Sequence, residues 1–569
     1  MHTKRWLVAP PLTPQADSNL QNYPPIVRQI LFNRGYATAA QAETFLEAQT
    51  DFDTHPFQMT GMQASADRIR YAIAHHESIA IYGDYDVDGV TATALLTQAL
   101  KALGGNVRPY IPNRFDEGYG LNPEALDSLK EDGVKLVISV DCGIRSPNEA
   151  AHARTLGLDL IITDHHHPAE ELPPAFAILN PKQPADAYPD KDLAGVGVAC
   201  KLAEALLLES ELQATERARF LNGLLDLVAL GTVADLAPLT GENRHLVRRG
   251  LEQMRSTQRQ GLFSLANVAG LNLSRVTAGD IGFVLGPRLN AAGRLDSALA
   301  AYELLVTSDI RRAGDLAQKL DRQNRERQAL TQQIQEQAEV LARADEEDAP
   351  LLFAIHPEFN PGVVGLAASR LVEIYYRPAI VGQLGEETLR CSCRSIPELH
   401  ITNALDECAD LLVQHGGHAA AAGFTVRVEN LEALKARLKE IARRELGGRD
   451  LRPTLSADVE VPLSAMHPDL LRYLTKLQPT GYGNPEPIFV SRGVQVKSAR
   501  QVGANGKHLK MTVSDGQITF DAIGFRLGHL YESLPSQVDL MYAFETNEYN
   551  GRISLQLNLK DVKPAGTPD

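Results

Sequence analysis

The chain has 569 residues, of which 44% are hydrophobic and 22% are charged. These values are typical of a soluble globular protein, and they exclude a disordered chain, a fibrous fold and a single small module. The net charge of −15 at pH 7 excludes a protein coated with basic surface for non-specific binding of nucleic acid. Length alone predicts three or four domains.

The cysteines and the N-terminal stretch indicate the compartment. The five cysteines are an odd and scattered set, and MHTKRWLVAPPLTP lacks the apolar stretch of a secretory signal. No apolar run approaches the length of about 18 residues that spans a membrane. We therefore expect a cytoplasmic protein without a membrane partner. Cys391 and Cys393 have no second pair at zinc-ligand spacing, so we interpret them as alternating residues of a strand.

Short β-branched runs alternate with helical patterns between about residues 60 and 200. The runs cover residues 78–82, 107–111, 135–140 and 158–163. Such runs predict the buried parallel strands of a doubly wound sheet, which binds ligands at the carboxyl ends of its strands. The first, third and fourth runs each end in acidic or histidine residues, so we expect these residues to meet at one edge of the sheet.

The predicted secondary structure of the rest of the chain falls into three successive regions. Residues 200–300 have a helical pattern, and residues 308–347 predict one long polar helix that bridges two domains. A second α/β unit follows, with strands near 350–355 and 379–381, the glycine-rich segment HGGHAAAAGF at 415–424 and a charged helix at 431–446. Residues 453–562 are rich in strands and short turns, which predicts a small all-β barrel or sandwich.

The loop GDYDVDG places Asp84, Asp86 and Asp88 at alternate positions before a predicted helix at 90–103. In an extended segment these carboxylates share a face and repel one another unless a cation is present. The alternatives are an acidic cluster at a helix N-terminus and a calcium loop. An EF-hand loop that starts at Asp84 would need a bidentate Glu at position 12, where the sequence has Leu95.

Two further clusters strengthen the metal hypothesis. Asp141 follows the third predicted strand, and the run from Asp164 to His167 follows the fourth. Asp235 comes after another apolar run and adds a carboxylate. An oxygen-rich site with one or two imidazoles suits manganese or magnesium better than zinc. Two such ions about 3.5–4 Å apart would clamp an in-line displacement at phosphorus, one activating water and the other stabilising the leaving oxygen.

At this point the ordered motifs resemble a known family. GDYDVDG, SVDCG, TDHHHP and ALGTVADLAPLTGENR are similar to the motifs of the DHH phosphoesterases. LAGVGVACKLA, GPRLNAAGRL, GVVGLAASRL, RCSCRS, GGHAAAAGF and PTGYGNPEP resemble the RecJ family of single-strand-specific exonucleases. The resemblance covers about residues 55–560. It implies a multidomain α/β protein with an N-terminal segment (1–54), a parallel-sheet DHH catalytic domain (55–305), a bridging helix (306–347), a DHHA1-like substrate-binding domain (348–448) and an OB-fold (453–562).

The resemblance also implies the roles of the acidic and histidine residues. It implies two Mn²⁺ or Mg²⁺ ions held by Asp86, Asp88, Asp141, His165 and Asp235, with Asp141 bridging the ions. Asp84 would join the first ion or its water, Asp164 would orient the imidazoles, and His166 would contact the scissile phosphate or its leaving oxygen. Smaller members of the family place a histidine ligand four residues before the first aspartate of Asp-x-Asp, a position that Tyr82 occupies here.

The predicted grip on the substrate uses guanidinium groups, which form bidentate bonds to phosphate oxygens, and glycines that allow close backbone approach. By resemblance, Arg114 and Arg394 form a 5′-phosphate pocket. The residues expected to contact the strand are Arg114, Arg288, Asn290, Arg294, Arg370, Arg394, Ser395, Gly416, Gly417 and His418. Residues 244–333 carry more basic than acidic side chains, so the acidic total still permits a local basic channel.

The implied function is 5′-to-3′ hydrolysis of single-stranded DNA to 5′-mononucleotides in DNA repair and recombination. The expected partners are a single strand with a free 5′ end, a helicase and a single-strand-binding protein, with the chain as a monomer. In the β domain the candidates for base stacking are Tyr482, Phe489, Phe520, Phe525 and Tyr549, although aromatic residues in a barrel more often form its core.

Two other functions remain open. One is a phosphodiesterase for small substrates such as oligoribonucleotides or cyclic dinucleotides, which the length and the β domain disfavour. The other is a catalytically silent binding module, which the retained acidic and histidine residues disfavour.

Overall fold

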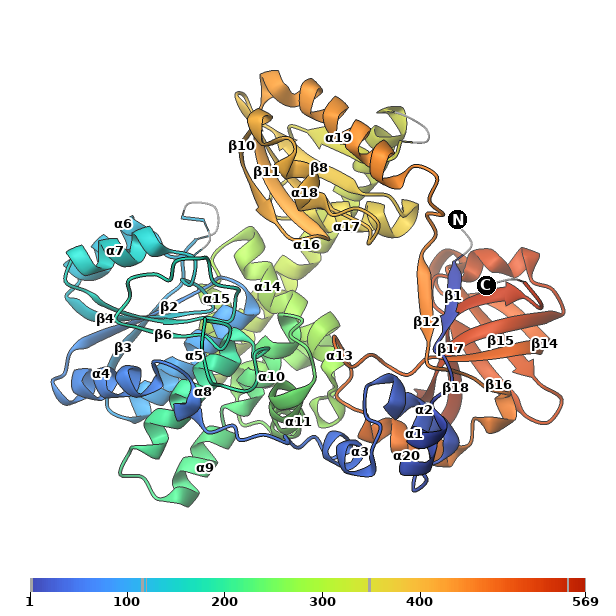
Figure 1. Ribbon diagram of the computed structural model, residues 1–569, viewed down its shortest axis with the longest axis horizontal. Coiled ribbons are helices and arrows are strands. Elements are labelled where there is room, and N and C mark those ends of the chain that lie inside the picture. Colours follow the sequence, from blue (N-terminus) through green and yellow to red (C-terminus); the bar gives the residue numbers. More distant parts are fainter. Residues whose placement is uncertain (1–3, 114–116, 119, 346–348, 550–551, 568–569) are drawn as a thin grey trace. The chain divides into compact units, whose positions relative to one another are not determined.

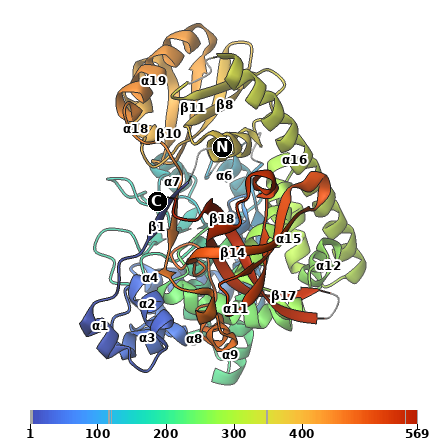
Figure 2. The same ribbon diagram turned by 90° about the vertical axis from the view of Figure 1, so that its right-hand side faces the viewer.

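The computed structural model describes residues 4–113, 117–118, 120–345, 349–549 and 552–567 (Figures 1 and 2). These residues group into two compact units. One unit consists mainly of residues 319–455, and the other consists of residues 6–293, 297–318 and 456 onward. Among the described residues, no helix has both the length and the apolar character needed to cross a membrane.

The predicted parallel sheet is confirmed. Its strands are β2 (Ser78–Gly83), β3 (Asn106–Tyr110), β4 (Val134–Val140), β5 (Asp159–Thr163) and the three-residue β6 (Ala177–Leu179), which is too short to stand out in the sequence. They are all parallel and lie in the order β3-β2-β4-β5-β6. The strand that follows β2 in the sequence, β3, lies on one side of β2, and the next strand, β4, lies on its other side. The strand order therefore reverses between β2 and β4, and a ligand site is expected where these two strands end.

Helices cover both faces of this sheet (Figure 1). One face carries α4 (Met62–Ala74), α5 (Val87–Ala102) and α8 (Gly195–Leu208), and the other carries α6 (Pro123–Glu131) and α7 (Pro147–Thr155). The helices that follow are α9 (Ala214–Asn222), α10 (Leu225–Ala234), α11 (Gly241–Arg255), α12 (Gln260–Ala269), α13 (Ala278–Asp280), α14 (Gly286–Leu295) and α15 (Leu299–Val306).

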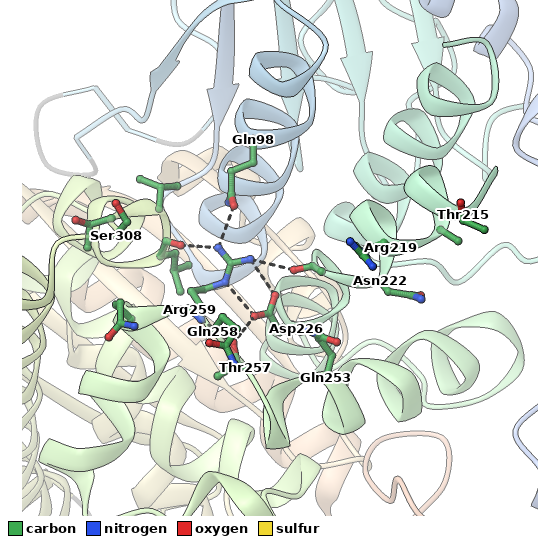
Figure 3. Close-up of a pocket in the computed structure, with 16 residues that line it drawn as sticks. Gln98, Thr215, Arg219, Asn222, Asp226, Gln253, Thr257, Gln258, Arg259 and Ser308 are labelled. Atoms are coloured by element: carbon green, nitrogen blue, oxygen red, sulfur yellow. Dashed lines mark hydrogen bonds and ion pairs between the residues drawn. The ribbon is translucent and has the colours of Figure 1, made fainter. Parts of the chain in front are cut away.

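Arg259 ties these helices together, as Figure 3 shows. Its guanidinium donates to both carboxylate oxygens of Asp226 at 3.0 Å, to the side-chain oxygen of Gln98 at 3.1 Å and to the carbonyl oxygen of Leu305 at 2.7 Å. The hollow beside it has a volume of about 890 Å³. None of the acidic or histidine residues of the predicted metal site lines this hollow, so we assign Arg259 a structural role.

The predicted long helix is α16 (Ile310–Asp345), and the last two residues of its predicted range lie outside the described residues. The unit of residues 319–455 contains a five-stranded sheet in the order β10-β11-β9-β8-β7. Its elements are β7 (Leu352–His356), α17 (Val364–Tyr375), β8 (Ala379–Leu384), β9 (Thr388–Arg394), α18 (Ile401–Asp406), β10 (Leu412–Gly417), β11 (Ala421–Arg427) and α19 (Leu431–Leu446). Cys391 and Cys393 lie two residues apart in β9, both buried in the core of this unit, as predicted.

Residues after 458 form a closed barrel. Its strands are β13 (Val459–Glu460), β14 (Phe489–Val502), β15 (His508–Ser514), β16 (Thr519–Gly524), β17 (Gln537–Tyr549) and β18 (Arg552–Pro564), and β14 pairs with both β15 and β17 to close the sheet. Phe489 and Phe520 are buried in its core, so they cannot stack on bases. Tyr482 and Phe525 are exposed, whereas the side chain of Tyr549 lies outside the described residues.

The N-terminal segment belongs to the same core, which the sequence did not predict. Its elements are β1 (Arg5–Val8), α1 (Pro14–Asn19), α2 (Pro25–Asn33) and α3 (Ala39–Leu46), and β1 pairs with β12 (Thr454–Ala457). Val27, Leu31 and Phe45 pack with Leu470 of α20 (Pro468–Lys476) and with the barrel residues. The first and last parts of the chain therefore share one hydrophobic cluster.

Arg244 joins this assembly to α11. Its side chain is buried and donates at 2.9–3.1 Å to the carbonyl oxygens of Phe45, Lys476, Leu477, Gln478 and Pro479. The guanidinium also lies 4.1 Å from the centre of the Phe45 ring. Four of these carbonyls lie at or just beyond the end of α20, where the helix dipole favours a cation. The motifs LTGENR and PTGYGNPEP thus meet in a structural joint.

Replacement of Arg244 by Met should destabilise this joint by roughly 3 kcal/mol or more, because five carbonyl oxygens lose a donor. Trp6, the only tryptophan, donates to Asp561 on the barrel at 2.8 Å, so its fluorescence can follow barrel unfolding in denaturant. The control is Arg248→Met on the same helix, since Arg248 donates to the Leu46 carbonyl alone among the described residues, and it should lose about 1 kcal/mol. Equal losses in the two variants would contradict the role given to Arg244.

Candidate metal centre

The loop after β2 turns sharply into α5. Asp86 is the N-cap of α5, and its carboxylate accepts the amides of Asp88 at 2.9 Å and Gly89 at 3.1 Å. A side chain on Gly89 would lie 2.6 Å from backbone atoms of Asp84, so only glycine fits there. The helix begins at Val87, three residues earlier than predicted, because Asp86 caps it. The expectation of one shared face for the three carboxylates is therefore wrong, since Asp88 is helical and points elsewhere.

Asp88 lies against the N-terminus of α8. It is 1% exposed, and its two oxygens accept the amides of Gly195 at 2.7 Å and Val196 at 2.8 Å. A side chain on Gly195 would lie 2.8 Å from the Cβ of Asp141, and one on Gly231 would lie 2.7 Å from Asp88 Oδ1. The glycines of LAGVGVACKLA and ALGTVADL thus let helices approach the acidic residues closely.

Asp141 and His165 follow β4 and β5. Asp141 has a φ of +60°, a left-handed conformation that is strained for most residues and often marks a functional site. His165 Nε2 lies 3.1 Å from Asp141 Oδ1, 3.7 Å from Asp235 Oδ2 and 3.9 Å from Asp88 Oδ2. This nitrogen is buried and has no hydrogen-bond partner among the described residues.

The potential ligand atoms form three overlapping groups, in each of which they lie within 4.8 Å of one another. The groups are Asp84 with Asp86 and Asp141, Asp88 with His165 and Asp235, and Asp141 with His165 and His166. Asp141 belongs to the first and third groups and His165 to the second and third, so the third group links the other two. The arrangement therefore offers two adjoining cation positions with Asp141 between them.

The electrostatics fit divalent cations. Burial, followed by repulsion from the other aspartates, raises the pKa values of Asp88 and Asp141 well above the usual range. Burial and the charge of Asp86 raise the pKa of Asp235 to about 7, while burial lowers the pKa of His165 to about 3. A neutral imidazole whose buried nitrogen faces several crowded carboxylates is a donor set suited to Mn²⁺ or Mg²⁺.

Asp164 holds the two histidines in place. Its Oδ1 accepts the amides of His165 at 2.7 Å and His166 at 3.1 Å and lies 2.7 Å from His166 Nδ1, while its Oδ2 accepts the amide of Ile144 at 3.0 Å. Burial alone would raise the pKa of Asp164 and lower that of His166, but the hydrogen bond between them reverses both shifts. His167 is exposed, and its carbonyl accepts from Arg145.

The Tyr82 hydroxyl is engaged in hydrogen bonds outside the group of potential metal ligands. It is fully buried, its hydroxyl donates to the Gly120 carbonyl at 2.9 Å, and the Asn122 amide donates to it at 3.1 Å. Burial raises the pKa of Tyr82 far above its usual value, so the phenol stays protonated. Asp84 occupies the space beside Asp86 and Asp141 instead.

The residues predicted to grip the strand are not part of this cluster. Arg114 lies outside the described residues. Arg288 and Asn290 lie on α14, where the Asn290 oxygen accepts the Val87 amide at 3.2 Å and so supports the start of α5. Arg294 donates to the Gly362 carbonyl at 3.2 Å.

The remaining predicted contacts belong to the unit of residues 319–455. Arg370 on α17 pairs with Glu373, an arrangement typical of a solvated surface arginine. The Ser395 hydroxyl donates to the Leu399 carbonyl at 2.7 Å. Gly416, Gly417 and His418 lie in or beside the exposed end of β10.

Sequence reasoning missed Asn180 and Lys182, which follow the short strand β6. The Asn180 amide donates to the His166 carbonyl at 2.9 Å, and the charge of Lys182 acts on both His165 and Asp235. A strand of three residues gives no clear pattern, so the only available signal was the polar Asn-Pro-Lys sequence after three apolar residues.

Comparison with known proteins places the chain in a family. Family models match residues 78–232 (DHH family, N-terminal domain), 348–444 (DHHA1 domain) and 457–561 (RecJ OB domain). The single-stranded-DNA-specific exonuclease RecJ of Bacillus subtilis is 41% identical over 542 residues, which are 95% of this chain and 68% of that protein. The RecJ of Escherichia coli K12 is 36% identical over 561 residues, 95% and 96% of the two chains.

A solved structure of a RecJ protein is also similar to this chain. The crystal structure of RecJ in complex with Mn²⁺ from Thermus thermophilus matches with a TM-score of 0.84 and 31% identity, over 99% of this chain and 80% of that one. The similarity extends over the DHH, DHHA1 and OB regions, in agreement with the observed parallel sheet and barrel. The chain belongs to the RecJ family.

Proposed function

We propose that this protein is a metal-dependent exonuclease that hydrolyses single-stranded DNA from its 5′ end to 5′-mononucleotides, in repair and recombination. The observation that carries the proposal is the pair of adjoining ligand groups around Asp141. Family membership supports the substrate, because the curated relatives are named as single-stranded-DNA-specific exonucleases. The DHHA1 and OB regions disfavour a small-substrate phosphodiesterase, and the complete acidic cluster disfavours a silent binding module.

Asp84, Asp86 and Asp141 would hold one divalent ion, and Asp88, Asp141, His165 and Asp235 would hold the second. Bound there, two Mn²⁺ or Mg²⁺ ions supply Lewis-acid chemistry, which activates water and neutralises charge that develops on the phosphate. Asp164 fixes the His165 and His166 main chain and accepts from His166 Nδ1, so that the other ring nitrogen of His166 can face substrate. That nitrogen can donate a hydrogen bond to a phosphate or leaving oxygen.

Arg394 is the best supported phosphate-binding residue. Its guanidinium donates to the Cys393 carbonyl and packs against Gly365 in the first turn of α17, where a side chain would lie 3.0 Å from Nη2. The described residues include no carboxylate partner for it, and burial lowers the pKa of Arg394. A half-buried guanidinium beside a helix N-terminus is suited to bind a terminal phosphate. We infer that it recognises the 5′ end, together with Arg114.

The function is tested with single strands labelled at either end, incubated with Mn²⁺ or Mg²⁺. Label at the 5′ end should be released first, as a mononucleotide. Asp141→Ala should abolish cleavage and leave DNA binding largely intact, since the other contacts to the strand do not depend on the ions. Release of the 3′ label first, or no release by the wild-type protein, would refute the proposal.

Because Asp141 is proposed to contact both ions, its replacement should change how Mn²⁺ affects the thermal stability of the protein. Addition of Mn²⁺ at about 100 times its Kd should stabilise the wild-type protein by about 2.7 kcal/mol, seen as a rise in the melting temperature. Asp141→Asn should lose this rise, yet be more stable than the wild type without metal, because one buried like charge is removed and asparagine tolerates the left-handed backbone.

The control is Asp127→Asn, a surface carboxylate that pairs with His152, and it should keep the full rise with Mn²⁺. An Asp141→Asn variant that is stabilised by Mn²⁺ as much as the wild type would contradict the ligand assignment.

The role of Arg394 predicts a loss of end recognition. Arg394→Ala should lower kcat/KM for a 5′-phosphorylated strand about 10- to 100-fold, because charge-assisted bonds to the phosphate are lost. The same change should affect a 5′-hydroxyl strand much less. Arg427→Ala, which removes an exposed arginine paired with Glu429, is the matched control. Equal losses on both strands would exclude a 5′-phosphate contact at Arg394.

A further inference from the structure

Asn243 is a buried asparagine that belongs neither to the proposed metal ligands nor to the residues expected to contact the strand. It is the third residue of α11 and is fully buried. Its side-chain amide donates to the Asp192 carbonyl at 2.6 Å and to the Pro238 carbonyl at 3.1 Å. An asparagine amide has two hydrogens, so both are used, and the reversed orientation would set its oxygen against two carbonyl oxygens. The side chain therefore ties together two separate segments of the chain.

The first segment leads to Asp88. Asp192 lies three residues before Gly195, and the two residues between them are fully buried. The amides of Gly195 and Val196 bond the two oxygens of Asp88 at 2.7 and 2.8 Å. The carbonyl that Asn243 holds is therefore separated by a short, packed connection from the amides that fix this carboxylate.

The second segment leads to Asp235. Pro238 lies three residues after Asp235, in the turn that follows α10. The Asp235 carboxylate accepts no hydrogen bond within the described part of the chain, and His165 Nε2 lies 3.7 Å from its Oδ2. The position of this carboxylate is therefore set mainly by its backbone. Asp88, His165 and Asp235 form one of the three groups of potential ligands, so both segments that Asn243 holds serve the same ion.

The start of α11 is a firm platform for this side chain. Glu242 and Lys201 of α8 form a buried ion pair at 3.1 Å, which fixes the two helices against each other. The Asp190 carboxylate accepts the Glu242 amide at 2.7 Å and the Asp192 amide at 3.0 Å. The loop before α8 is therefore attached to α11 at two points, one through Asp190 and one through Asn243.

We propose that Asn243 is a positioning residue for the second metal ion, which holds Asp88 and Asp235 at the separation that one divalent ion requires. This inference rests on the proposed function and deepens it. Like charges repel, so the two carboxylates stay together only if their backbone is restrained. Groups behind metal ligands commonly set metal affinity in this way. Both hydrogens of the amide serve the second ion, so the effect should fall on that ion rather than on the one held by Asp84 and Asp86.

The alternative is a purely structural role, for which Asn484 is the matched case. Asn484 is also buried, and its amide donates to the carbonyls of Leu477 and Pro479, both at 2.8 Å. These carbonyls belong to the joint around Arg244 and do not lead to a proposed metal ligand. The two asparagines therefore bond the same number of carbonyls at similar burial and differ in what those carbonyls position.

The test compares Asn243→Ala with Asn484→Ala in the full chain by titration with Mn²⁺, with free Mn²⁺ measured by electron paramagnetic resonance. We expect the wild type to bind two ions and Asn243→Ala to bind one of them about 10- to 100-fold more weakly. Asn484→Ala should keep both affinities, although the thermal midpoint should fall in both variants. Wild-type affinity for both ions in Asn243→Ala, or equal losses in the two variants, would overturn the inference.

The dependence of cleavage on Mn²⁺ provides a second readout. Asn243→Ala keeps every ligand, so its rate should be low at limiting Mn²⁺ and should recover when the concentration is raised about 10- to 100-fold. Asp235→Ala lacks a ligand and should not recover. A deficit of Asn243→Ala that persists at saturating Mn²⁺ would contradict a role through the metal.

The binding titration also separates this inference from the proposed function. A wild-type protein that binds two ions, one of them weakened by Asn243→Ala, but does not cleave single strands would refute the exonuclease activity and still support the inference. A wild-type protein that binds no Mn²⁺ would refute both.

Asp190 gives an independent test should Asn243→Ala fail to fold. Asp190→Ala releases the same loop from Glu242 and leaves Asn243 in place, so it should weaken binding of the same ion by a smaller factor. Unchanged affinity for both ions in this variant would contradict the claim that the loop before α8 positions Asp88.

Discussion

The close approach of buried and half-buried carboxylates at the ends of β2, β4 and α10 is the constraint on which the catalytic region depends. Aspartates crowded around a neutral imidazole are unfavourable in a low-dielectric environment. The surrounding structure offsets this in part with the amides at the N-terminus of α8, which bond Asp88, and with the cap at the start of α5. The negative charge of the aspartates that these amides do not offset would be neutralised by bound cations. Much of the nearby architecture, including the glycines of α8 and α10, serves to bring backbone close enough to hold these groups.

Much of the fold followed from local pattern, because buried parallel strands and long helices leave clear signals over many residues. The four long strands of the first sheet and the helix α19 were predictable for this reason. The convergence of Asp84, Asp141 and His165 was predictable too, since parallel strands place their carboxyl ends at one edge. The start of α5 was not, because the capping role of Asp86 depends on the turn geometry. The strand β6 was too short to predict.

Side-chain roles were harder to predict than positions, and the arginines show why. Arg244, Arg370 and Arg394 all lie in motif segments, yet one is bonded to five carbonyls, one pairs with a glutamate and one has no carboxylate partner among the described residues. The contacts of Arg244 join segments more than 190 residues apart in the chain, which a single sequence does not encode locally. The same holds for Phe489 and Phe520, since burial inside a barrel depends on how its strands close.

The shared core of the N-terminal helices and the barrel has a consequence for the synthesis of the protein. Trp6 and its partner Asp561 are 555 residues apart in the chain. At a synthesis rate of roughly 5–20 residues per second, the first helices leave the ribosome tens of seconds before the barrel exists. During that time Val27, Leu31 and Phe45 lack the apolar surface that buries them in the finished protein. The N-terminal segment therefore completes its hydrophobic core only after the barrel has been synthesised.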